Sequence, residues 1–133
     1  MIALSGGAAL FALMGNGIAL GKQSNEAREL KGPRANYPLI ASWFNLEGYC
    51  EVQFSVDEVG FPFAVTPSCT RRIFCSEAKR AVTDAKFAPK RVNGMAQIRT
   101  NVVYPMVFFI DGSGYNKDED PRQLELCEPK AVA

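Results

Sequence analysis

The sequence contains no histidine. Histidine has the side chain whose ordinary pKa lies nearest neutrality, and it is the commonest metal ligand in proteins. Without it the usual general base and the usual ligand for a transition metal are missing, and we identify no nucleophile paired with a base. We therefore expect a protein that is not an enzyme and that uses no metal and no cofactor.

The sequence also lacks an excess of either charge. Fifteen Lys and Arg residues stand against fourteen Asp and Glu residues, so the formal net charge is +1. Such a balance produces no field that steers a protein toward nucleic acid, and we expect no nucleic-acid partner. A chain of 133 residues has room for one compact domain plus appendages.

Residues 1–21 lack charge altogether, and Ser5 and Asn16 are their only clearly polar side chains. A run of about 20 apolar residues is long enough to cross a bilayer as a helix, so this segment is expected to be a signal sequence or a membrane anchor. The small residues Ala19 and Gly21 favour cleavage, whereas the absence of any basic residue before Lys22 argues against it. Both alternatives stay open, and membrane contact is expected only through this segment if it is retained.

Residues 22–36 are polar and are broken by Gly32-Pro33, which predicts a linker with a short helical turn around residues 26–30. Fully extended, these fifteen residues span at most ~50 Å. A domain over residues 37–112 follows. It begins with a predicted short helix after Pro38, in which Trp43 is expected to lie in or beside the core.

Strict alternation marks the first predicted strand, with Cys50, Val52, Phe54 and Val56 on one face. Residues 57–60 predict a turn that ends in Gly60, followed by a return strand from Phe61 to about Ser68. Because this return strand contains two prolines, which cannot donate to a ladder, it is expected at a sheet edge.

From Phe74 the apolar period changes to that of a helix, with Ala78, Ala81, Val82 and Ala85 on the same face. After a turn at Asn93-Gly94, residues 97–110 alternate loosely and predict a long third strand. The order β-β-α-β gives the α+β class. Residues 113–133 are expected to be a polar loop and tail. A calcium site in this loop is not expected, because a calcium loop that began at Asp111 would require glycine at its sixth position and glutamate at its twelfth, and the sequence has neither.

Four cysteines in a small chain that is expected to leave the cytoplasm favour disulfides over metal binding, although four free thiols remain an alternative. Four cysteines allow three connectivities. The predicted hairpin places Cys50 across from residues 67–69, which favours a bridge to Cys69 and leaves Cys75 to pair with Cys127. The first bridge would close a loop of about twenty residues, worth roughly 3 kcal/mol in the chain-entropy model.

The region from Tyr37 to Ile110 resembles the C-terminal, periplasmic domain of the TonB family. The resemblance rests on the order and spacing of several short patterns over most of the predicted domain. These are Tyr37-Pro38, Glu47-Gly48 with the alternation that follows, Asp57 to Gly60, Phe74 with Ala78 and Ala81-Val82, Lys86 to Pro89, Asn93-Gly94, and Tyr104-Pro105 before Phe108. The pair Cys50 and Cys69 is also similar to a variant of that family.

This resemblance implies a two-layer domain, with a three-stranded antiparallel sheet, a short N-terminal helix and one main helix packed on one face. It further implies a periplasmic protein-binding module for outer-membrane transport, either secreted or tethered by residues 1–21. The partner would be an extended, TonB-box-like segment of an outer-membrane receptor, bound by strand addition. The histidine that couples the family's anchor to the proton-driven motor is absent, so we expect recognition without force transmission.

The third strand is the expected acceptor, because the proline-bearing second strand is a poor edge for pairing. The predicted partner-binding residues are Gln97, Ile98, Arg99, Thr100, Asn101, Val102, Val103 and Tyr104. The alternative is a plain edge strand protected by Arg99 and Pro105. The second functional hypothesis is a structural or envelope-assembly component that uses the same domain to form a homodimer or to bind another periplasmic partner.

Overall fold

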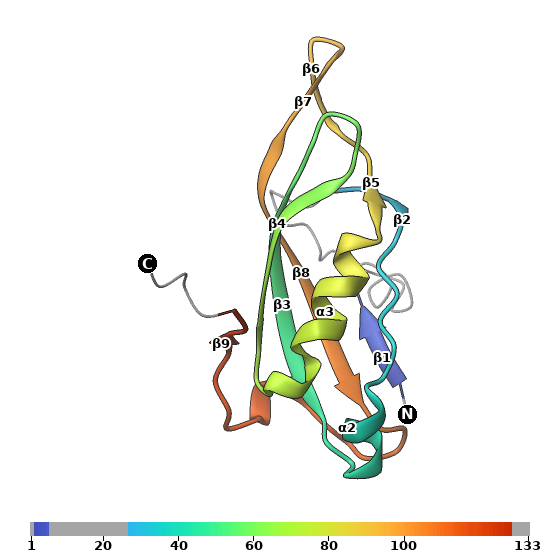
Figure 1. Cartoon of the computed structure of the whole chain (residues 1–133), viewed down its shortest axis with the longest axis vertical. Helices are drawn as coiled ribbons and strands as arrows, with labels where there is room; N and C mark the ends of the chain where they lie inside the picture. The colour runs from blue at the N-terminus through green and yellow to red at the C-terminus, as the bar shows by residue number, and fades with distance from the viewer. Residues whose placement is uncertain (1, 6–26, 129–133) are drawn as a thin grey trace.

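The chain folds around one five-stranded antiparallel sheet, as seen in a computed structural model that describes residues 2–5 and 27–128 (Figure 1). The strand order is β1-β8-β3-β4-β9. The strands are β1 (Ile2–Ser5), β3 (Gly48–Val56), β4 (Pro62–Cys69), β8 (Arg99–Phe109) and β9 (Glu125–Leu126). The helix α3 (Cys75–Thr83) crosses one face of the sheet, so the core lies between this helix and β3, β4 and β8.

The central strand β3 follows the predicted alternation. The four residues of its apolar face, Cys50, Val52, Phe54 and Val56, are no more than 1 % exposed. The alternate residues of the strand face the other side of the sheet and are exposed or half-buried. The pattern was therefore a reliable sign of a half-buried strand.

The turn between β3 and β4 lies where the sequence predicts it. Oδ1 of Asp57 accepts hydrogen bonds from the backbone N–H groups of Val59, Gly60 and Phe61, each at 2.9 Å. Gly60 has φ of 109°, and a Cβ added there would collide with the carbonyl oxygen of Phe87. A residue other than glycine would therefore meet both backbone strain and a steric clash at this position.

The predicted amphipathic helix is confirmed. The five residues of its expected apolar face, Phe74, Ala78, Ala81, Val82 and Ala85, are at most 3 % exposed. A 3-10 turn (Arg72–Phe74) leads into α3, and the ring of Phe74 stacks on Phe108 of β8 with 4.4 Å between their centroids. Small alanine side chains let the helix approach the sheet closely, while aromatic rings fill the ends of the core.

Two smaller sheets extend the molecule, and the sequence predicted neither of them as a sheet. One joins β2 (Glu29–Lys31) to β5 (Lys86–Phe87), and the other joins β6 (Lys90–Val92) to β7 (Met95–Gln97). The turn in the second hairpin is at Asn93 and Gly94, with φ of 53° and 81°, as the sequence predicted. The prediction of a helical turn around residues 26–30 is wrong, because residues 29–31 form the strand β2.

The predicted fold class is also wrong. The expected domain was a three-stranded sheet with two helices, whereas the described residues form a sheet-rich fold with one five-stranded sheet, two two-stranded sheets and one substantial helix. The edge strands β1 and β9 are too short to carry a local pattern. They form because residues distant in sequence pair with them, Phe109 with Ile2 and Ser68 with Leu126.

The expected N-terminal helix is a single turn, α2 (Leu39–Trp43), and it does not form a packed layer. Only Ala41 of this turn is buried, while Trp43 is 66 % exposed, so its predicted place in or beside the core is wrong. A one-turn helix can bury one side chain and leave the rest in solvent, which a periodicity argument over so few residues does not foresee.

The predicted third strand over residues 97–110 is interrupted. β7 ends at Gln97, β8 begins at Arg99, and β8 carries a bulge at Asn101, where φ is 58°. Of residues 1–21, the expected signal sequence or anchor, only residues 2–5 are described, as the strand β1. Among residues 2–5 and 27–128, no helix is long and apolar enough to cross a membrane.

Candidate functional site: the outer edge of β8

β8 is paired on its two sides to different extents. Its inner side pairs with β3 along nearly the whole strand, but on its outer side β1 covers only Met106 to Phe109. Among the described residues, no strand pairs with the outer side of Arg99 to Pro105, which we call the open edge. An unpaired strand edge presents backbone donors and acceptors that a second extended chain can complete.

Pro105 determines which backbone groups point outward. In an antiparallel pair, successive residues turn their N–H and C=O groups alternately toward and away from the partner strand. Pro105 lies opposite Glu51 and has no N–H, so it belongs at a position turned away from β3. Val103, two residues earlier and opposite Gln53, then has the same orientation. The open edge therefore offers the N–H and C=O of Val103 and the C=O of Pro105.

The bulge at Asn101 limits this edge. Phe54 pairs with Val102 while Val56 pairs with Arg99, so β8 has one extra residue opposite β3. Oδ1 of Asn101 accepts a hydrogen bond from Nε2 of Gln53 at 3.3 Å. Because a bulge turns the strand and raises its twist, the regular part of the open edge runs from Val102 to Pro105.

The structure distributes the eight predicted partner-binding residues over three different settings. Gln97 pairs with Lys90 in the β6–β7 hairpin, and Ile98 connects that hairpin to β8. Val102 and Tyr104 face α3 and are 2 % and 8 % exposed. The remaining four lie on or beside the open edge, where Thr100, Asn101 and Val103 are exposed and Arg99 is half-buried.

Arg99 has an unusual environment for a cation. Its Nε atom is buried and makes no hydrogen bond within the described part of the chain. A buried donor without a partner is costly, and this one lies on the side of β8 that pairs with Val56, whose side chain belongs to the core face. This orphan donor lies at the start of β8, beside the open edge.

The sheet face opposite α3 has a small hollow next to Val103. Its volume is ≈160 Å³, and its lining comes from β3, β4, β8 and the C-terminal strand region: Glu51, Gln53, Thr66, Ser68, Val103, Leu124 and Leu126. A chain that paired with Val103 would direct alternate side chains to this face. The hollow mixes polar and apolar groups, so it would accommodate one small side chain rather than a large ligand.

The loop after β8 covers the other end of this face. Nζ of Lys117 lies 4.8 Å from the centre of the Tyr49 ring, and the Tyr49 hydroxyl donates to Oε2 of Glu51 at 2.8 Å. Burial, together with this hydrogen bond, raises the pKa of Tyr49. Tyr49 is therefore held neutral and packed, and it is not placed to act as a base.

Both expected disulfides are present, the first predicted from the hairpin and the second by elimination. Cys50 is bonded to Cys69, its direct partner across β3 and β4, and Cys75 is bonded to Cys127. The second bond fixes β9 beside the start of α3. Among the described residues, the only group of three or more potential metal ligands within reach of one another is Cys69, Cys75 and Cys127, all of which are in disulfides.

The sequence did not predict an exposed apolar patch around α2, at the end of the molecule away from the β6–β7 hairpin (Figure 1). Its members, Leu39, Ile40, Trp43 and Phe44, are 52–68 % exposed. No residue from Ala35 to Leu46 is charged. This uncharged segment is the sequence feature from which a contact surface could have been predicted. We call these four residues the α2 patch.

No protein-family model matches this chain, and no curated protein matches it in sequence. The described residues define a small antiparallel-sheet protein with two disulfides, in which no other described strand covers the outer side of the first part of β8.

Proposed function

We propose that this chain is a periplasmic protein-binding module of TonB type, which recognises an extended segment of an outer-membrane transport receptor by adding it as a strand to β8. The observation that supports this most directly is the pairing of β1 with Met106 to Phe109. An extended segment of the chain itself already lies antiparallel along this edge, so the edge has the geometry that strand addition requires.

The open edge supplies both affinity and some selectivity in this proposal. Val103 donates and accepts backbone hydrogen bonds, and its side chain beside the hollow contacts alternate side chains of the partner. The regular edge is short, so the expected affinity is modest.

The test is titration of the ¹⁵N-labelled full chain with synthetic receptor segments of the TonB-box type, followed by NMR. We expect amide shifts concentrated in residues 99–105, with Val103 among the largest. Val103→Pro removes the outward N–H and should abolish binding, while its matched control, Val103→Thr, keeps that N–H and the branched side chain and should bind. Binding that survives Val103→Pro would refute strand addition at this edge.

The α2 patch favours the second hypothesis, a structural or envelope-assembly component that forms a homodimer or binds another periplasmic protein. Four large apolar side chains side by side on a small surface are typical of a protein contact. Sedimentation at increasing concentration should then show association that Ile40→Ser with Trp43→Ser removes. Val59→Ser, which changes an equally exposed apolar residue far from α2, is the control. A chain that stays monomeric at every concentration would leave no support for the homodimer.

A further inference from the structure

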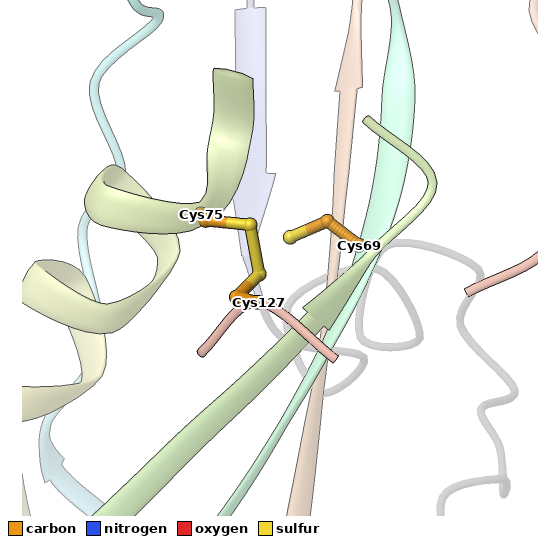
Figure 2. Close-up of side chains that lie close together, drawn as sticks. All are labelled: Cys69, Cys75 and Cys127. Carbon is orange, nitrogen blue, oxygen red and sulfur yellow. A yellow bond between two sulfur atoms is a disulfide. The ribbon is translucent and has the colours of Figure 1, made fainter. Parts of the chain in front are cut away.

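The two disulfides of this protein lie against each other. Cys69, from the end of β4, points its sulfur toward the bond between Cys75 and Cys127 (Figure 2). The Sγ atoms of Cys69, Cys75 and Cys127 all lie within 4.8 Å of one another. Thiol–disulfide exchange requires a thiolate to approach one sulfur of a disulfide, and this arrangement places each bond within reach of the other after a small side-chain movement.

Access from solvent differs sharply between the two bonds. Cys50 and Cys69 are 0 % and 2 % exposed, so their disulfide is enclosed in the core. Cys75 is half-buried, and both Cys75 and Cys127 line a groove of ≈430 Å³ between α3 and the β4–β9 edge. An external thiol can therefore reach the Cys75–Cys127 bond through the groove, but not the bond behind it.

The position of Cys75 favours it over Cys127 as the attacking thiolate. Cys75 is half-buried and lines the groove, whereas Cys127 is only 7 % exposed, and a thiolate in contact with solvent forms more readily than a buried one. The basic residues of the groove add little, because Lys79 is paired with Glu128, and Arg80 with Glu77 and Asp84.

We propose that the two disulfides form an exchange pair, in which reduction enters at Cys75–Cys127 and passes to the buried Cys50–Cys69 bond through Cys75. In the first step an external dithiol, small or protein-borne, gives two electrons to the Cys75–Cys127 bond and becomes a disulfide itself. In the second step the Cys75 thiolate attacks Sγ of Cys69. A Cys69–Cys75 bond forms, the Cys50–Cys69 bond breaks, and the electron pair leaves on the Cys50 sulfur, so this step involves no net oxidation or reduction.

The exchange changes how the C-terminal region is held. Once Cys75 is bonded to Cys69, Cys127 has no covalent partner, and β9 is retained by non-covalent contacts. These are its short ladder with Ser68 and Cys69, the Cys127 N–H on the Pro67 carbonyl, the Arg72 guanidinium on the Cys127 carbonyl, and the Lys79–Glu128 ion pair. If β9 then leaves, the outer side of β4 at Ser68 and Cys69 becomes available for pairing. The inference is independent of peptide binding at β8, because it rests on different residues and a different edge.

The first experiment uses the full-length Cys127→Ser variant, which has one free thiol at Cys75 and needs no reductant. The protein is kept at pH 8, acid-quenched, alkylated with N-ethylmaleimide and mapped by mass spectrometry. We expect label on Cys75 and also on Cys50, the latter at least tenfold above the wild-type chain treated identically. Label confined to Cys75 would overturn the proposal, as would equal label on Cys50 and Cys69, because the geometry directs attack to Cys69 alone.

A second measurement keeps the proposal testable should that variant fold poorly. The wild-type chain is treated with one equivalent of dithiothreitol, then quenched and mapped in the same way. The expected single-disulfide product is Cys69–Cys75, with label on Cys50 and Cys127. A product that retains Cys50–Cys69 throughout would refute the relay, and a Cys69–Cys127 product would refute the assignment to Cys75. The same reaction in guanidinium gives the statistical mixture expected without the fold.

Discussion

Tyr37 shows how a single residue connects the α2 turn to the core. Its ring packs edge-to-face on Phe74 and Phe108, with centroids 5.9 and 6.0 Å away, and its hydroxyl donates to the carbonyl of Leu46. Burial, with a smaller contribution from the Glu47 carboxylate, raises the pKa of Tyr37 to about 12. The ring therefore holds residues 37–46 on the core as a neutral phenol.

We predict that Tyr37→Phe lowers the free energy of unfolding by about 1 kcal/mol at pH 7, the usual value of one hydrogen bond. Because the folded pKa lies above the unfolded value, about 10, this stabilisation is complete below pH 10 and disappears as the pH rises through 12. Urea unfolding at pH 7, 10 and 12 measures it. The wild-type and Tyr37→Phe stabilities should converge at the highest pH, and a constant difference would contradict the prediction.

Asp120 illustrates a polar residue of the C-terminal loop that the sequence did not single out. Its carboxylate is nearly enclosed and accepts hydrogen bonds from the Tyr115 hydroxyl at 2.7 Å and the Arg122 N–H at 3.0 Å. Burial alone would raise the pKa of Asp120, but these hydrogen bonds and the Arg122 charge hold it below its usual value. This part of the expected polar loop is thus locally ordered around one carboxylate.

At the scale of elements, the strands β1 and β8 matter most for the proposed function. β1 occupies the part of the β8 edge next to the open edge, so it either guides an incoming strand or competes with it. By the alternation that Pro105 sets, Val107 and Phe109 turn their N–H groups toward β1. These two amides therefore report whether β1 is in place.

We predict that Ala3→Pro combined with Leu4→Pro displaces β1, because one of two consecutive prolines must remove an N–H directed at β8. Hydrogen exchange at Val107 and Phe109 should then accelerate. Affinity for the receptor segment should rise about tenfold, which corresponds to ~1.4 kcal/mol of displaced pairing. Ala3→Val with Leu4→Val, which keeps both N–H groups, should change neither quantity. Faster exchange without tighter binding would mean that β1 does not compete for the partner.

At the scale of the whole molecule, the disulfides close two loops that do not overlap in sequence. Cys50 and Cys69 are 19 residues apart, and Cys75 and Cys127 are 52 apart. The longer loop restrains more of the unfolded chain, and it also fixes β9, which has few contacts of its own.

We predict that Cys75→Ser with Cys127→Ser lowers the free energy of unfolding by about 4 kcal/mol, the chain-entropy value for a loop of this length. Denaturant unfolding of the full chain measures the loss. Glu125→Ala with Leu126→Ala, which truncates exposed side chains of β9 and keeps the disulfide, should cost below about 0.5 kcal/mol. A similar loss in both variants would attribute the effect to β9 itself and not to the covalent bond.

The features that sequence alone determined are local or joined by one tight turn. Alternation in β3, the Asp57–Gly60 turn, the buried face of α3 and the pairing of Cys50 with Cys69 were all predicted correctly, because each depends on a period or a spacing within about twenty residues. The proximity of the two disulfides was not predicted, since it depends on how the start of α3 meets the end of β4.

Tertiary structure decided the rest. The five-stranded order depends on Ile2 meeting Phe109 and Ser68 meeting Leu126, and strands this short have no pattern of their own. The break at Ile98 and the bulge at Asn101 follow from the register with β3, which local periodicity does not specify. Long-range pairing therefore decides which backbone groups of β8 have no partner among the described residues, while the sequence predicted only a strand over residues 97–110.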